Sequence, residues 1–92
     1  MTPRGVVRLL NTADGRVLCL AGEVDERAVE AFLERYGREP ARIDRIDAGS
    51  VTALSPPGLA LLREHLAAAQ WAGRPVTVVV GPVVERLLAE DP

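Results

Sequence analysis

The chain is predicted to be a single α/β domain over residues 1–92, with a mostly parallel sheet of about four strands and helices packed on it. Short apolar runs rich in β-branched residues alternate with amphipathic stretches of helical length, in the order β-β-α-β-α-β-α. The length of 92 residues fits one domain, and an apolar fraction of 48% is enough for one continuous core.

The chain is expected to begin with a β-hairpin. Two apolar runs, residues 6–10 and 16–21, are separated by Ala13-Asp14-Gly15, and an Asp-Gly pair accepts the positive φ of a tight turn. Side chains on both faces of this second strand are apolar, which predicts a central strand covered on both sides.

The first helix has clear start and stop signals. Asp25 is a suitable N-cap, and Val24 and Val29 have the spacing of a hydrophobic staple. Gly37 is expected to end the helix in a left-handed conformation. The apolar stripe of this helix comprises Val29, Phe32, Leu33 and Tyr36.

The remaining elements follow from the alternating pattern. Residues 42–47 are the least regular strand, because Ile43 and Ile46 are three positions apart instead of two. A second helix is predicted from about Pro57 to Ala72, and the run from Pro75 to Val80 is predicted to be a buried parallel strand. The second helix is expected to have one apolar face, made of Leu59, Leu62, Leu66 and Ala69. A last short helix is predicted by Val83, Val84, Leu87 and Leu88.

Charge and composition argue against several classes of partner. The formal net charge is −2 and there is no basic stripe with interleaved aromatic residues, so nucleic acid is not expected to bind. The apolar runs are far too short to insert into a membrane, and the segment Met1-Thr2-Pro3-Arg4-Gly5 lacks the apolar core of a secretion signal. With a single cysteine as well, the expected location is the cytoplasm.

No enzyme site can be assembled from the reactive residues. Cys19 lies in the middle of a strand and is expected to be a small buried hydrophobe, while His65, the only histidine, is expected to be solvated on the second helix. A Cys19–His65 pair would need an exposed thiol and a third group. Glu23 and Asp25 are two residues apart, but capping already explains Asp25. No cluster has metal-ligand spacing, so neither a metal nor a cofactor is expected.

The order and spacing of several short motifs resemble those of the STAS family, the fold of bacterial anti-sigma-factor antagonists. Gly22-Glu23-Val24-Asp25 resembles the family's Gly-Glu-Leu-Asp before its first helix, and Asp47-Ala48-Gly49-Ser50-Val51 is similar to its Asp-Leu-Ser-Gly-Val after the central strand. Ser55-Pro56-Pro57-Gly58-Leu59 falls where the family has Asp-Ser-Ser-Gly-Leu, and Trp71-Ala72-Gly73-Arg74-Pro75 resembles its turn into the next strand. Many members continue with a further strand and helix beyond the position of Pro92.

The chain departs from the family at the phosphorylated position. The resemblance places the usual phosphoacceptor serine at Pro56, which has no hydroxyl, and leaves Ser55 as the nearest substitute. Because a residue before proline avoids the α region, Ser55 and Pro56 are expected to be extended, with Pro57 as the first helical residue. Gly58 keeps its N–H, so a weak residual anion site is expected at this helix start.

The resemblance therefore implies a cytoplasmic, non-catalytic module that regulates by binding protein partners and is not phosphorylated at the usual site. The partner would be an anti-sigma factor of the serine-kinase type. An alternative is a non-catalytic STAS subunit of a multiprotein complex, such as the ATPase assembly of a lipid-transport ABC system, and a small enzyme ranks third. The expected binding surface combines the exposed face of the second helix with Glu23, Asp25, Ser55, Pro56, Pro57 and Gly58.

Overall fold

The computed structural model describes residues 4–90 and has the predicted element order. Two short ends of the chain lie outside the described residues, Met1–Pro3 and residues 91–92. The first of these is part of the segment expected to lack a secretion signal. The strands are β1 (Gly5–Thr12), β2 (Gly15–Val24), β3 (Arg45–Leu54) and β4 (Thr77–Val80), and the helices are α1 (Glu26–Tyr36), α2 (Pro56–Trp71) and α3 (Pro82–Ala89).

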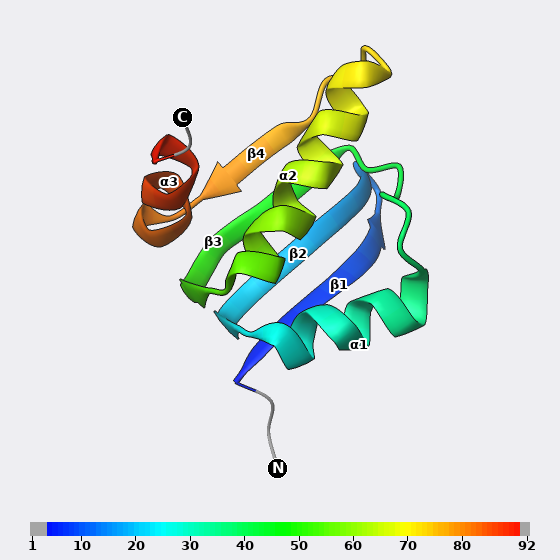
Figure 1. Cartoon of the computed structure of the whole chain (residues 1–92). Coiled ribbons are helices and arrows are strands. Elements are labelled where there is room, and N and C mark those ends of the chain that lie inside the picture. Colours follow the sequence, from blue (N-terminus) through cyan, green and yellow to red (C-terminus); the bar gives the residue numbers. More distant parts are fainter. Residues whose placement is uncertain (1–3, 91–92) are drawn as a thin grey trace.

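The four strands form one sheet in the order β1-β2-β3-β4 (Figure 1). The hairpin pair β1 and β2 is antiparallel, whereas β2–β3 and β3–β4 are parallel. The turn itself is Ala13-Asp14, and Gly15, the first residue of β2, has the positive φ, 119°, that was expected of it. The prediction of a mostly parallel, four-stranded sheet is confirmed.

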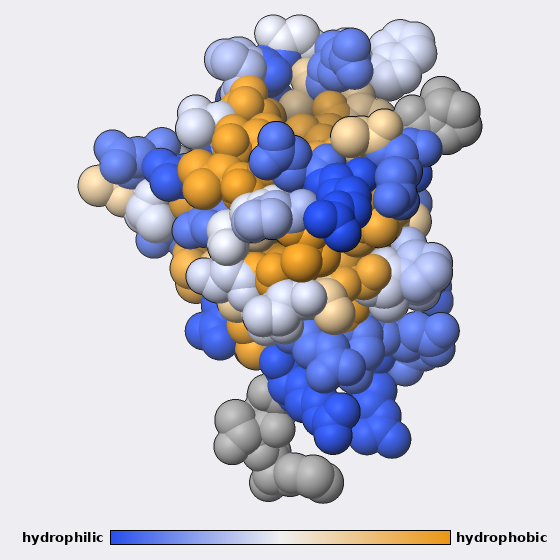
Figure 2. Space-filling view, turned by 90° about the vertical axis from the view of Figure 1, so that its left-hand side faces the viewer, coloured by the Kyte–Doolittle hydropathy of each residue, from blue (hydrophilic) through white to orange (hydrophobic). Residues whose placement is uncertain are grey.

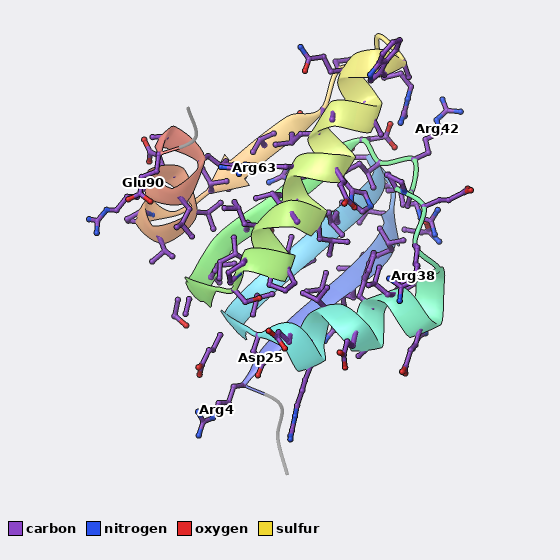
Figure 3. The ribbon with its side chains drawn as sticks, in the orientation of Figure 1. Arg4, Asp25, Arg38, Arg42, Arg63 and Glu90 are labelled. Atoms are coloured by element: carbon purple, nitrogen blue, oxygen red, sulfur yellow. The ribbon has the colours of Figure 1, made fainter. Side chains whose placement is uncertain are left out.

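The core lies between one face of the sheet and the helices. Side chains alternate between the faces of a strand, so the register places the buried Val7, Leu18, Leu20 and Ile46 on one face together. Helices α1 and α2 lie in front of this face in Figure 1, and α3 lies beside α2. Arg63 reaches from α2 towards α3, where its guanidinium donates to the carbonyl oxygen of Leu87 at 3.4 Å (Figure 3).

The opposite face of the sheet has no helix packed on it within residues 4–90. It carries the exposed Arg8 and Arg45 and the partly exposed Leu10 and Val79. The prediction that β2 is covered on both sides was therefore wrong. Apolar residues on both faces of a strand are typical of a strand covered on both sides, but the neighbouring elements decide which face is covered.

Strand β3 differs most from its predicted position. It begins at Arg45 instead of Arg42, and Ile43, which is fully buried, precedes it in the loop. The segment from Asp47 to Val51, expected after the strand, lies inside it. Its pairing with β2 shifts register between Cys19 and Ala21 and again between Gly22 and Glu23. These bulges each insert a residue and break the two-residue periodicity that sequence analysis relies on.

Strand β4 is parallel, as predicted, but it is not buried. It forms an edge of the sheet, and Val78 and Val79 are 40% and 37% exposed. Figure 2 looks at the side of the molecule on which β4 and α3 lie and shows apolar side chains gathered in its middle, with hydrophilic residues around them. A pure β-branched run predicts a strand, but it does not tell an edge strand from a central one.

Helix α1 matches its predicted signals. Asp25 caps it, and Val24 and Val29 are both buried, as a hydrophobic staple requires. Gly37 ends the helix with a positive φ of 88°, but its ψ of 175° lies outside the left-handed helical region that was expected. This combination of angles is essentially restricted to glycine.

Helix α3 forms where Val83, Val84, Leu87 and Leu88 predict a short helix, with Val84 fully buried and the other three half-buried. Helix α2, in contrast, is rotated relative to the prediction. It buries Gly58, Leu61, Leu62, His65 and Ala69, whereas Leu59 and Leu66 are only half-buried. The predicted face was drawn through the leucines, and it left out the buried histidine and glycine.

Candidate functional site

The two segments predicted to bind a partner lie side by side. Strands β2 and β3 run parallel, and Val24 pairs with Leu54 at their carboxyl ends. The Ser55 N–H donates to the carbonyl oxygen of Val24 at 2.9 Å, which joins the β3–α2 junction to the β2–α1 junction. The parallel pairing thus brings Glu23 and Asp25 next to the Ser55–Gly58 segment, although the two segments are some thirty residues apart in sequence.

Helix α2 starts one residue earlier than predicted. Ser55 is the N-cap with an extended backbone, φ −69° and ψ 161°, as expected for a residue before proline. Pro56, however, is already helical, at position N1, and Pro57 occupies N2. The N–H groups of the first helical positions have no partner within a helix, so two prolines in succession cost no hydrogen bond there.

The start of α2 retains no free N–H group to hold an anion. Pro56 and Pro57 have no N–H, and the Gly58 N–H donates to the Ser55 hydroxyl oxygen at 3.2 Å. The next N–H, that of Leu59, donates to the Ser55 carbonyl oxygen at 2.9 Å. Anion sites at helix starts depend on N–H groups that point outwards unpaired, and here each is absent or occupied. The weak residual anion site expected at Gly58 is therefore not present in this geometry.

Gly58 is required for packing. It is buried, and a Cβ atom at this position would lie 2.7 Å from Cδ1 of Leu54 and 3.2 Å from Cγ1 of Val24. The absence of a side chain lets the first turn of α2 sit directly on the ends of β2 and β3. Within the segment, Pro56 is exposed and Ser55 and Pro57 are half-buried, so these three residues form its accessible surface.

The two acidic residues of the β2–α1 junction have different partners. Oδ1 of Asp25 accepts from the Ala28 N–H at 2.9 Å, which makes it the helix cap. Glu23 lies 3.7 Å from the Arg4 guanidinium, but both side chains are well exposed, and such surface pairs contribute little to stability. Figure 3 shows Asp25 at the first turn of α1, with Arg4 below it.

The two residues with nucleophile or base chemistry lie on opposite sides of the sheet. His65 is on α2, on the core side, whereas Cys19 pairs with Asp47 and Arg8 on the open face. Cys19 is half-exposed, so the prediction of a buried residue was wrong. Partial burial, and secondarily the negative charge of Asp47, raise the pKa of its thiol, while the positive charge of Arg8 acts in the opposite direction.

His65 is buried, with 1% of its surface exposed, and not solvated as predicted. Its Nδ1 lies 2.9 Å from the Leu61 carbonyl oxygen, and its Nε2 accepts from the Ala41 N–H at 3.1 Å. Both ring nitrogens therefore have a partner: Nδ1 bonds within α2, and Nε2 holds α2 to the loop before β3. Among residues 4–90, no group of three or more His, Cys, Asp or Glu residues is arranged to hold a metal ion.

Sequence analysis did not single out the most exposed aromatic side chain. Trp71 ends α2 with 91% of its surface exposed, and Ala67 and Gln70 line a shallow hollow beside it. The same side of the helix exposes Ala60, Glu64 and Ala67, which precede Trp71 in successive steps of three or four residues. The spacing of this stripe is present in the sequence, but the leucines of α2 are the stronger signal there and indicate a different exposed face.

No protein-family model matches the chain, and neither the curated proteins nor the solved structures contain a significant match. In the part of the chain that the structure describes, no helix has both the length and the apolar character needed to span a membrane. Any functional conclusion therefore depends on the geometry of this chain and on the motifs it carries.

Proposed function

We propose that this chain is a protein-binding regulatory module of the anti-sigma-factor-antagonist kind, and that it binds without a phosphorylation switch at the start of α2. The observation that carries the proposal is the outward face of α2, which presents Trp71 almost completely exposed at one end and Pro56 at the other. Tryptophan is among the residues most enriched at the energetic centres of protein interfaces.

The proposed surface extends along the whole helix. Sixteen residues of α2 span about 24 Å, and the stripe of Ala60, Glu64 and Ala67 leads from the Ser55–Pro57 segment to Trp71. Small residues in this stripe allow a partner element to approach closely. Glu23, at the β2–α1 junction beside the start of α2, adds an exposed charge at the rim.

The absence of a switch follows from the start of α2. A phosphate on this segment would have no unpaired N–H group to accept from. Pro56 has no hydroxyl, and Ser55 already uses its hydroxyl oxygen as the helix cap. A surface that does not depend on phosphorylation also suits the second candidate, a permanent non-catalytic subunit of an ATPase assembly. The genes next to this one separate the two candidates: a kinase and a sigma factor for the first, an ABC-type ATPase and a permease for the second.

The test is affinity capture from the native host with the wild-type chain and two single variants, followed by titration of the purified partner. Trp71→Ala should weaken binding at least about tenfold, because truncating an energetic centre of an interface commonly costs about 2 kcal/mol or more, and about 1.4 kcal/mol is tenfold. Gln70→Ala is the matched control, since Gln70 is exposed on the same turn. Trp71 is the only tryptophan, so its fluorescence should shift to shorter wavelength in the complex. Unchanged affinity for Trp71→Ala would contradict the proposed surface.

A further inference from the structure

The open face of the sheet carries a regular arrangement of side chains. Three rows cross β1, β2 and β3 on this face, as the strand register shows. The rows are Leu10–Val17–Arg45, Arg8–Cys19–Asp47 and Val6–Ala21–Ser50. Most of the β1 and β2 positions are apolar, and Leu10 is 39% exposed.

The middle row has opposite charges on either side of its centre. Arg8 on β1 and Asp47 on β3 both flank Cys19 on β2, and both charges act on the pKa of its thiol, Asp47 raising it and Arg8 lowering it. One strand separates them, so their backbones are about 10 Å apart and their side chains leave the same face side by side, and no ion pair joins the two within residues 4–90. Each charge therefore faces away from the sheet without an ion-pair partner in its row.

We propose that two copies of this chain pair through the open faces of their sheets, about a two-fold axis that runs parallel to β2. Rotation about this axis places β1 of one copy over β3 of the other. Arg8 of each copy then faces Asp47 of its partner, and Cys19 faces its own counterpart at the centre. Packed sheets lie about 10 Å apart, a distance that facing arginine and aspartate side chains can bridge.

The charges also exclude the other simple arrangements of the same two faces. A two-fold axis perpendicular to the strands would place Arg8 over Arg8 and Asp47 over Asp47, which is unfavourable. An axis between β2 and β3 would place Cys19 over Asp47. Only the axis along β2 pairs both opposite charges and buries the apolar centre. This face lies across the sheet from α2, so the proposal does not depend on the proposed function.

Charge reversal tests the arrangement directly by sedimentation velocity over a concentration series. We expect the wild-type chain to form dimers, and Arg8→Asp and Asp47→Arg each to remain monomeric, because each leaves two like-charged pairs across the interface. An equal mixture of the two single variants should form a heterodimer, since aspartate at 8 then faces arginine at 47. The double variant R8D/D47R should form a homodimer again. Arg86→Asp, an exposed site on α3, is the control for a charge change elsewhere.

The mixing experiment also controls for misfolding, because a chain that fails to fold cannot regain dimerisation from its partner. Cys19, the only cysteine, gives a second reading. In the dimer it is covered, so its alkylation by iodoacetamide should slow as the wild-type concentration rises, and should not slow in Arg8→Asp alone. A wild-type chain that is monomeric throughout the series, or single variants that dimerise alone as well as when mixed, would overturn the proposal.

Discussion

The backbone N–H of Ala41 donates a hydrogen bond to Nε2 of His65, 24 residues further along the chain, at 3.1 Å. Because Nε2 is the acceptor, Nδ1 carries the proton and donates to the Leu61 carbonyl oxygen. The ring also lies edge-on to Phe32 of α1, with 6.1 Å between centroids. One buried side chain thus connects α1, α2 and the loop that leads into β3.

We expect His65→Leu to lower the free energy of unfolding by about 1–3 kcal/mol, because it leaves the part-buried Ala41 N–H without an acceptor. Glu64→Leu is the matched control on the neighbouring exposed position and should change stability by less than about 0.5 kcal/mol. Urea denaturation measures both. Equal stability of the two variants would mean that the hydrogen bond to Ala41 contributes nothing.

The cap of α1 predicts a second difference. Asp25→Ala removes the acceptor of the Ala28 N–H and should cost about 0.5–2 kcal/mol, whereas Asp25→Asn should cost little, since asparagine caps about as well. Thermal or chemical denaturation of the two variants shows whether the cap depends on the side-chain oxygen or on the negative charge. Large and equal losses in both variants would assign the carboxylate a different role.

Gly58 gives a test of the packing at the proposed binding segment. Gly58→Ala should destabilise the chain by about 1–3 kcal/mol, because the new methyl group meets Leu54 and Val24 in a filled space. Gly49→Ala is the control: its Cβ would come no closer than 3.6 Å to Val79, an ordinary contact on an exposed strand position. Equal free energies of unfolding for the two variants in urea would mean that the packing of α2 on Leu54 and Val24 does not require a glycine at position 58.

The start of α2 predicts the absence of phosphorylation. We expect no stoichiometric phosphate on the Ser55–Gly58 segment in protein purified from its native host, and a partner interaction that does not respond to kinase activity. Intact-mass and peptide mass spectrometry make the measurement. A substantial phosphorylated fraction at Ser55 that disappears in Ser55→Ala, together with altered partner binding, would show that the switch exists.

The elements that the sequence determined by itself are those whose signals are local. The cap at Asp25, the staple of Val24 and Val29, and the Asp14-Gly15 turn each act within a few residues, so they can be recognised without knowing their surroundings. The same holds for the extended backbone of Ser55 before Pro56. The alternation of such segments was then enough to predict the α/β class and the element order.

The tertiary structure alone decided which surfaces are covered and which positions pair. The register of β3 with β2 pairs Asp47 with Cys19 on the open face, and the two bulges of β3 follow this pair. His65 is buried because Ala41, far away in sequence, offers a donor, and Trp71 is exposed because no described segment packs on the end of α2. Burial depends on what packs against a residue across the fold, and neither periodicity nor residue type contains that information.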